Sequence, residues 1–150
     1  VRYPRGAQRA IPESIKPTFA DFDVFGDENA EKAIITYGRT FSACAFAYEK
    51  LVNSGESVKL IKLNRIIPVC EGAVEAAKDC RDVYFFEEGI RRGGAGEGFL
   101  FDLSKAGFSG KYHLRAIENG FVKQASVESL LHKYGFDEEG VLSFVTSVEA

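Results

Sequence analysis

Residues 83–98 read Val-Tyr-Phe-Phe-Glu-Glu-Gly-Ile-Arg-Arg-Gly-Gly-Ala-Gly-Glu-Gly, a β-branched and aromatic run followed by a glycine-rich turn. The run is typical of a buried strand, and a helix can begin after the turn. Such a junction can direct backbone N–H groups at an anion. Gly93, Gly94 and Gly96 are therefore candidates for an anion-binding turn, or alternatively glycines that let a helix pack closely on a sheet. The sequence favours the packing alternative.

Two nucleotide-binding motifs contain glycines at similar spacings, and neither fits this turn. The pattern G-x-G-x-G over residues 94–98 puts Phe99 where the dinucleotide motif requires its third glycine. The P-loop interval over residues 89–94 is followed by Ala95 and Gly96 instead of the Lys and Ser/Thr that hold phosphate and Mg²⁺. The glycines therefore indicate a tight turn without naming a nucleotide.

The same alternation of strand and helix signals extends along the chain from about residue 19. Apolar runs predict strands over residues 19–25, 32–37, 57–63, 82–87 and 112–117. Helices are predicted over residues 41–52, from Pro68, from the glycine turn to about Ala106, from a Ser126 cap to near Gly135, and after an Asp137 cap. Repeated strand–helix units of this length predict an α/β fold, with a mainly parallel sheet covered by helices on both faces.

The composition is that of one ordinary folded domain. The chain has 150 residues, 45% of them hydrophobic, which excludes a disordered or fibrous protein. A net charge of -3 gives no electrostatic reason to expect nucleic acid or an anionic membrane as a partner. No apolar run approaches the length of about 20 residues that a membrane span needs. Cys44, Cys70 and Cys80 lack metal-ligand spacing and indicate reduced, buried thiols in a cytoplasmic protein.

The candidate acid–base residues are few. His113 lies in a predicted strand and His132 near the end of a short helix, and neither has a partner that spacing reveals. Glu87 and Glu88 are adjacent, so they point to opposite faces of a strand and cannot form a catalytic pair there. We expect these two to be the solvated end of the strand, with the alternative that one of them points into a cleft beyond its carboxyl end. No residue set in the chain forms a self-sufficient active site.

Basic residues occur at two loops. Arg91 and Arg92 precede the glycine turn and are expected to be surface charge. Residues 2–6, Arg-Tyr-Pro-Arg-Gly, hold two guanidinium groups around a Tyr-Pro unit that limits backbone freedom. A forked donor held at a strand end is a good physical solution for binding a phosphate group. The chain also starts without Met in the middle of this motif, which indicates a piece of a longer polypeptide.

Several of these segments occur together in one enzyme family. They are residues 2–6 (Arg-Tyr-Pro-Arg-Gly), 34–38 (Ile-Ile-Thr-Tyr-Gly), 58–61 (Val-Lys-Leu-Ile), 87–89 with 93–96 (Glu-Glu-Gly and Gly-Gly-Ala-Gly), and 130–140 (Leu-Leu-His-Lys-Tyr-Gly-Phe-Asp-Glu-Glu-Gly). In this order they resemble the end of the 1-deoxy-D-xylulose-5-phosphate synthases over essentially the whole chain. The glycine turn alone would fit any transketolase-like enzyme, including the β subunits of 2-oxoacid dehydrogenases.

The resemblance implies a division of the chain and a fold. It places residues 1–6 at the end of a pyrimidine-binding domain, 7–20 in an interdomain linker, and 21–150 in a transketolase C-terminal-like domain. The implied fold is a three-layer α/β/α sandwich. Its five-stranded sheet is mixed, with four parallel strands and one antiparallel edge strand, for which residues 19–25 are the candidate.

The resemblance also implies an activity. Family enzymes are homodimers that condense pyruvate with glyceraldehyde 3-phosphate, release CO₂, and feed isoprenoid and thiamine biosynthesis. They use thiamine diphosphate and Mg²⁺, which the upstream domains of the same polypeptide bind. Arg5 is the one position to which a substrate role carries over, as a ligand of the aldehyde's phosphate. The fragment alone is then inactive, has no catalytic, cofactor or metal residues of its own, and supports the dimer.

Some positions depart from the family pattern. Asn64 and Cys70 stand where an Arg and an Asp are usual around Pro68, and residues 118–120 (Glu-Asn-Gly) replace a Pro-Asp-Arg. These changes leave open a divergent paralogue, a transketolase or a 2-oxoacid dehydrogenase β-type domain. A stand-alone, non-catalytic α/β module for binding or dimerisation is the alternative from a different class.

Overall fold

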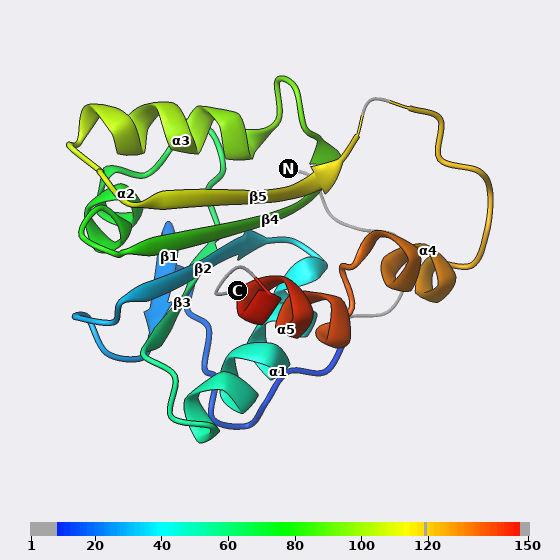
Figure 1. The fold of residues 1–150 in the computed structure, drawn as a ribbon, viewed down its shortest axis with the longest axis horizontal. Coiled ribbons are helices and arrows are strands. Elements are labelled where there is room, and N and C mark those ends of the chain that lie inside the picture. The colour runs from blue at the N-terminus through cyan, green and yellow to red at the C-terminus, as the bar shows by residue number, and fades with distance from the viewer. Residues whose placement is uncertain (1–8, 119, 148–150) are drawn as a thin grey trace.

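The computed structural model describes residues 9–118 and 120–147, and a five-stranded sheet forms its centre (Figure 1). The strands lie in the order β1-β3-β2-β4-β5. Their bounds are β1 Phe22–Phe25, β2 Lys32–Tyr37, β3 Val58–Leu63, β4 Asp82–Ile90 and β5 Lys111–Ile117. The helices are α1 Thr40–Asn53, α2 Glu71–Ala77, α3 Ala95–Lys105, α4 Val127–Tyr134 and α5 Glu138–Ser147.

The sheet is mixed, as predicted. β2 pairs in parallel with both β3 and β4, and β5 pairs in parallel with β4. β1 pairs antiparallel with β3 at the edge, from Phe22 opposite Leu63 to Phe25 opposite Leu60. The predicted reversed edge strand is confirmed, although it begins at Phe22 and not at Phe19, whose side chain is fully exposed.

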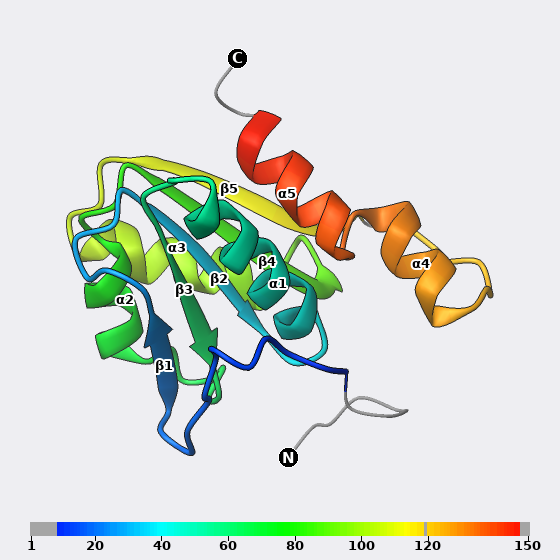
Figure 2. The same cartoon turned by 90° about the horizontal axis from the view of Figure 1, so that it is seen from below.

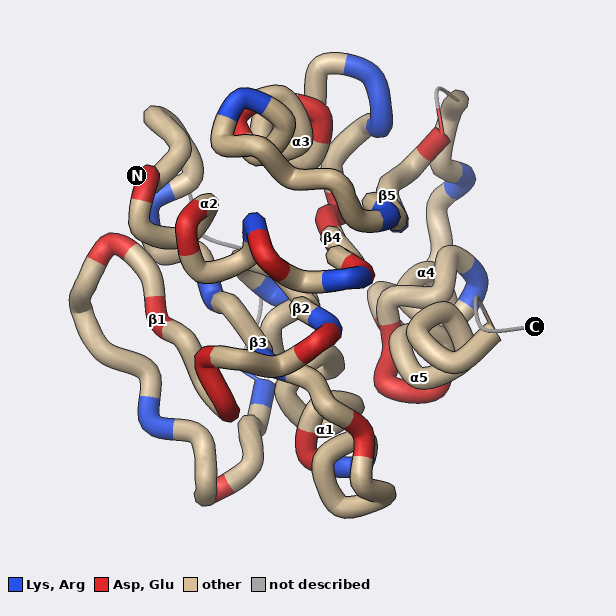
Figure 3. Tube along the Cα trace, turned by 60° about the vertical axis from the view of Figure 1, so that its left-hand side comes forward, with Lys and Arg blue, Asp and Glu red and all other residues tan. Residues whose placement is uncertain are grey.

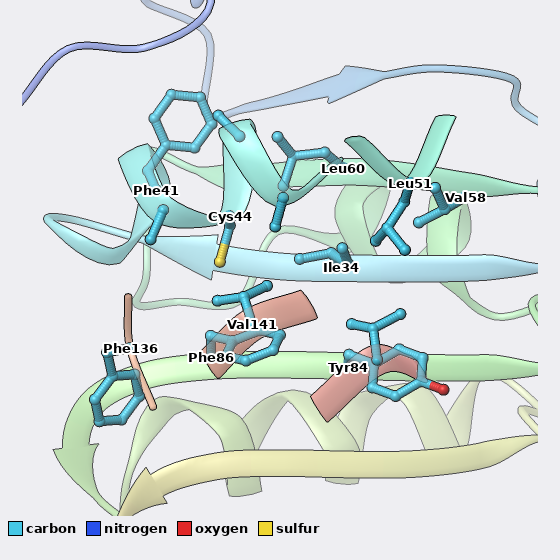
Figure 4. Packing of buried hydrophobic residues seen from close by; sticks show 14 of the residues in the cluster. Ile34, Phe41, Cys44, Leu51, Val58, Leu60, Tyr84, Phe86, Phe136 and Val141 are labelled. Atoms are coloured by element: carbon cyan, nitrogen blue, oxygen red, sulfur yellow. The ribbon is translucent and has the colours of Figure 1, made fainter. Parts of the chain in front are cut away.

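Helices cover both faces of the sheet and enclose two apolar clusters (Figures 1 and 2). α1 and α5 lie on one face, where Ile34, Leu60 and Phe86 point from the strands toward the helices (Figure 4). α2 and α3 lie on the other face over Ile35, Ile61 and Phe85. The alternation of the inward residues along β2, β3 and β4 follows the two-residue period of a strand, so each strand supplies both clusters. This arrangement is the predicted three-layer sandwich.

Two predicted boundaries were wrong. The helix expected to begin at Pro68 begins at Glu71, because Cys70 before it still has extended backbone angles. The strand expected to end at residue 87 continues to Ile90, which pairs with Ile117 beyond an irregularity after Phe86. The pairing partner, and not the local sequence, decides where this strand ends.

The ends of α4 and α5 follow the predicted capping residues. The Ser126 hydroxyl accepts a hydrogen bond from the Ser129 backbone N–H, and Gly135 ends α4 in the left-handed conformation. A carboxylate oxygen of Asp137 accepts from the Gly140 N–H at the start of α5. α4 lies beyond the carboxyl end of β5, to one side of the sheet (Figures 1 and 2).

The segment before β1 packs along α1. Ile15 is buried against the α1 face of the sheet, and the Ser42 hydroxyl donates a hydrogen bond to the Ala10 carbonyl. Acidic and basic residues are interspersed along the trace (Figure 3). Within residues 9–118 and 120–147, no helix is long and apolar enough to cross a membrane.

The three cysteines give a first testable prediction. Cys44, Cys70 and Cys80 are buried free thiols, as predicted. Burial raises the pKa of Cys44 to about 12 and also raises that of Cys80, and only the thiolate reacts readily. We expect the native chain to resist a disulfide reagent at pH 8, and all 3 thiols to react once urea unfolds it. Rapid modification of the native protein would contradict this packing.

Candidate functional site

The sheet has one position where its topology favours a ligand. The connection from β2 through α1 leads to β3 on one side, and the connection from β4 through α3 leads to β5 on the other. In open α/β sheets, a crevice forms at the carboxyl ends of two neighbouring strands whose connections diverge in this way. Here those strands are β2 and β4, whose pairing ends at Thr36 and Phe86, next to Tyr37 and Glu87. The glycine turn before α3 lies at the same edge.

Glu87 occupies this crevice from within the protein. Its side chain is completely buried. One carboxylate oxygen accepts hydrogen bonds from the Tyr37 hydroxyl at 2.9 Å and the Ala95 N–H at 3.0 Å, and the other accepts from the Gly96 N–H at 3.0 Å. Two N–H groups that the first turn of a helix leaves unpaired thus bind an internal carboxylate, which the positive end of the helix dipole also favours.

A second carboxylate binds the other side of the turn. The Gly93 N–H donates to the Glu97 carboxylate at 2.8 Å. Gly93 has a φ of 77°, in the region that favours glycine. The backbone N–H groups at the start of α3 therefore already bind the carboxylates of Glu87 and Glu97. The negative charge of these two side chains would repel an external anion. We expect phosphate to leave the amides of Gly93, Gly94 and Gly96 unmoved.

Close packing explains the glycines around Glu87. A Cβ at Gly94 would collide with a carboxylate oxygen of Glu87 and with the Ile90 carbonyl oxygen. A Cβ at Gly96 would lie 2.5 Å from a Leu114 methyl group and 3.1 Å from the same carboxylate oxygen of Glu87. The missing side chains make room for the buried carboxylate.

One expectation about this site was wrong. Glu87 and Glu88 were expected to be a solvated strand end, and only Glu88 is exposed. The strand continues to Ile90, so Glu87 lies inside the sheet and turns toward the start of α3. Tyr37, which sequence reasoning treated only as the end of a strand, completes the site with its hydroxyl. An apolar run that ends in carboxylates just before a cluster of glycines is the sequence signal for this arrangement.

A buried tyrosine holds α3 from its other side. The Tyr112 hydroxyl donates to the Gly96 carbonyl at 2.7 Å. Burial, together with the charge of Glu87, raises the pKa of Tyr112 above its ordinary value of 10. The phenol therefore acts as a permanent donor, which suits a structural role and not acid–base chemistry.

The remaining sequence candidates are dispersed over the molecule. Arg91 donates to the Glu118 carboxylate at 2.6 Å and to the Leu114 carbonyl, whereas Arg92 is exposed. His113 contacts a carboxylate oxygen of Asp82 at 3.0 Å, far along the strand from the glycine turn. Arg5 lies outside the described residues. Among the described residues, no group of three or more His, Cys, Asp or Glu side chains could hold a metal ion.

His132 and Asp137 form the second testable prediction. Their side chains lie 2.6 Å apart between α4 and α5. The hydrogen bond and charge of Asp137 raise the pKa of His132 above its ordinary value of 6.5. Burial alone would raise the pKa of Asp137, but hydrogen bonds from His132 and the Gly140 N–H outweigh it and lower that pKa below 3.8.

The sign of the pH effect follows from these directions. The contribution of His132 to stability is present below pH 6.5 and is lost as pH rises through its raised pKa. The contribution of Asp137 is present above pH 3.8 and is lost as pH falls through its lowered pKa. An NMR titration should show His132 titrating above 6.5, and Asp137→Asn should return it toward that value. An unchanged His132 titration in Asp137→Asn would show that the pair does not form.

The comparisons assign this sheet and its helices to a domain of the transketolase type. The chain matches the family "Transketolase, C-terminal domain" over residues 26–141 and belongs to it. A solved structure titled "Split gene transketolase, inactive beta4 tetramer" superimposes with a TM-score of 0.76 and 20% identity, covering 91% of this chain and 46% of that one. At that identity the likeness concerns the fold alone.

Curated relatives point to one enzyme within this class. The chain is 30% identical over 116 residues to the 1-deoxy-D-xylulose-5-phosphate synthase of Bacteroides fragilis, covering 76% of this chain and 18% of that protein. It is 24% identical to the synthase of Shouchella clausii and 27% identical to that of Geobacillus thermodenitrificans, in each case over 99% of this chain and 24% of the relative. The chain thus spans a quarter or less of the length of these relatives.

The start of α3 does not offer a site for a diphosphate group. A diphosphate needs free N–H donors, and those at the start of α3 already bind Glu87 and Glu97. A Cβ-sized group has no space beside Gly94, so a bulkier phosphate has none either. The glycine turn of this domain is therefore a packing junction, and we assign no cofactor ligand to it.

Proposed function

We propose that this chain works as the C-terminal domain of a thiamine-diphosphate-dependent 1-deoxy-D-xylulose-5-phosphate synthase. In the reaction, the bond between the carboxylate and the carbonyl carbon of pyruvate breaks, and CO₂ leaves. A new carbon–carbon bond forms to the aldehyde carbon of glyceraldehyde 3-phosphate, whose oxygen takes up a proton. Thiamine diphosphate, held with Mg²⁺ by domains outside this chain, supplies the electron sink for the two-carbon unit.

One observation carries the proposal. The curated relatives described above are synthases of this single reaction, and two of them align over 99% of the chain. The geometry of the domain is compatible with a supporting role, since its crevice is closed by Glu87 and Tyr37. The domain would brace the upstream domains and the second subunit of a homodimer. The split-gene transketolase, whose β4 tetramer is titled inactive, offers a precedent for a part that is inert alone.

The test uses the complete polypeptide that carries this domain. Purified protein should form 1-deoxy-D-xylulose 5-phosphate and CO₂ from pyruvate and glyceraldehyde 3-phosphate, and omission of thiamine diphosphate should abolish the product. The 150-residue chain alone should show no turnover and no thiamine diphosphate binding by calorimetry. Refusal of pyruvate with use of ketose phosphate donors would indicate a transketolase instead. Activity without thiamine diphosphate would end the proposal altogether.

Arg5 provides a residue-level prediction within this function. We propose that its guanidinium binds the phosphate of the aldehyde substrate, as the family resemblance implies. In the complete enzyme, Arg5→Gln should raise the KM for glyceraldehyde 3-phosphate by about tenfold or more, because a charge-assisted bond to phosphate is lost. The KM for pyruvate should stay unchanged. The matched control Arg9→Gln should leave both values as they are, and equal losses in the two variants would remove the assignment.

A further inference from the structure

A pocket of about 550 Å³ lies beyond the carboxyl end of β5, and Arg91, just before the glycine turn, also lines it. The end of β5, the segment after it and the end of α4 form its walls, and Phe144 of α5 closes one side. Figure 1 shows the path of the chain from β5 to α4. The volume falls within the range of about 300–1,000 Å³ that is usual for small-molecule sites.

Arg115 is the central group of the pocket. Its guanidinium carbon lies 4.2 Å from the centre of the Phe144 ring. On another side is the turn after α4, where a Cβ at Gly135 would lie 2.9 Å from a terminal nitrogen of Arg115. The Nε atom is buried and has no hydrogen-bond partner among the described residues. The side chain is thus held in place while part of its donor capacity is unused.

The pocket around Arg115 has more positive than negative side chains. Glu118, the acidic residue in the pocket wall, already accepts the hydrogen bond of Arg91. Lys133 lies over the Tyr134 ring at 5.4 Å, and no ion pair joins it or Arg115 to a carboxylate within the part of the chain that the structure describes. Burial and the nearby Arg91 both lower the pKa of Arg115, although a guanidinium stays charged at neutral pH. Arg115 is partly buried and its buried Nε atom has no hydrogen-bond partner among the described residues, so an anion bound in the pocket would supply the counter-charge that the surrounding protein does not.

We propose that this pocket binds a small ligand that carries an oxyanion, a phosphate or carboxylate group, on an apolar body. The planar fork of Arg115 matches either oxyanion with two parallel hydrogen bonds, and Lys133 adds a second charge. Phe144, Tyr134 and the fully exposed Phe121 supply apolar surface for the body. This site is separate from the closed crevice at Glu87, and it does not depend on the proposed synthase reaction.

An NMR titration of the 150-residue chain tests the proposal with three probes: phenyl phosphate, benzoate and uncharged phenol. Either anion should shift the amide signals of Arg115, Phe121 and Tyr134 saturably, and the tighter of the two identifies the preferred head group. The amides of Gly93–Gly96 should stay unmoved. Phenol that binds as tightly as both anions, or anions that give no saturable shift, would overturn the proposal.

Variants separate the guanidinium from general packing. Arg115→Leu keeps an apolar side chain but removes the guanidinium over Phe144, and it should weaken anion binding by about tenfold or more. Arg115→Lys should keep part of the affinity, because the charge remains. Arg92→Leu removes an exposed arginine outside the pocket and should change nothing. Native-like spectra with undiminished binding in Arg115→Leu would reject the assignment of Arg115.

Discussion

Replacement of Glu87 by alanine should lower the free energy of unfolding by about 3–4 kcal/mol, among the largest effects of any single substitution in this domain. The change removes the acceptor of two backbone N–H groups, those of Ala95 and Gly96, and of the Tyr37 hydroxyl. The Gly96 N–H is left in a buried site and the other two donors in partly buried ones, and the loss of an acceptor for a buried donor costs about 1–3 kcal/mol. Urea unfolding followed by circular dichroism measures the difference.

Two further variants make the Glu87 result specific. Glu87→Gln keeps the size of the side chain but turns an amide NH₂ toward an N–H donor, so we expect an intermediate loss of about 2 kcal/mol. Glu88→Gln changes the adjacent, exposed carboxylate, whose contact with Arg39 is long at 3.9 Å, and should alter stability by less than about 0.5 kcal/mol. Similar losses for Glu87→Ala and Glu88→Gln would show that the buried carboxylate is not the structural centre of the turn.

Gly94→Ala should destabilise the domain by about 3 kcal/mol, because the added methyl group overpacks a site that cannot expand. The methyl would collide with the Glu87 carboxylate and with the Ile90 carbonyl, a backbone atom in paired β4. The same substitution four residues later has the opposite expected sign. Gly98 lies in α3 with open space around its Cβ position, and Gly98→Ala should stabilise the helix by about 0.5–1 kcal/mol.

The pair of alanine variants is its own control, since the chemical change is identical. Thermal unfolding should move the two midpoints in opposite directions from the parent. If Gly94→Ala unfolds at the same temperature as Gly98→Ala, the turn is looser than the structure has it, and the packing explanation of the glycines is wrong.

The sheet was predictable because its strands are local patterns. The apolar runs at residues 32–37 and 57–63 are bounded by turn residues, and each matches its observed strand to within a residue. The capping roles also follow from the sequence, because each capping residue bonds to backbone groups only a few residues away. These residues are Ser126, Gly135 and Asp137. Such features need no knowledge of what packs against them.

The site was less predictable because its contacts are between distant segments. Glu87 is buried only because glycines from the following turn leave room for it and Tyr37 from β2 reaches it. Arg115 belongs to a strand whose periodicity shows nothing unusual, and its surroundings come from α4 and α5. A carboxylate or guanidinium is most often solvated, so sequence alone favours the surface until the tertiary partners are known.

The central claim is that this domain supports a 1-deoxy-D-xylulose-5-phosphate synthase. A domain exchange with a related synthase tests it most directly. This chain would replace the aligned 24% of the Shouchella clausii synthase, and product formation from pyruvate and glyceraldehyde 3-phosphate would be measured. We predict a rate within about tenfold of the parent enzyme and far above that of the enzyme truncated at the same point. A chimera that is folded and binds thiamine diphosphate, yet is no more active than the truncated enzyme, would contradict the claim.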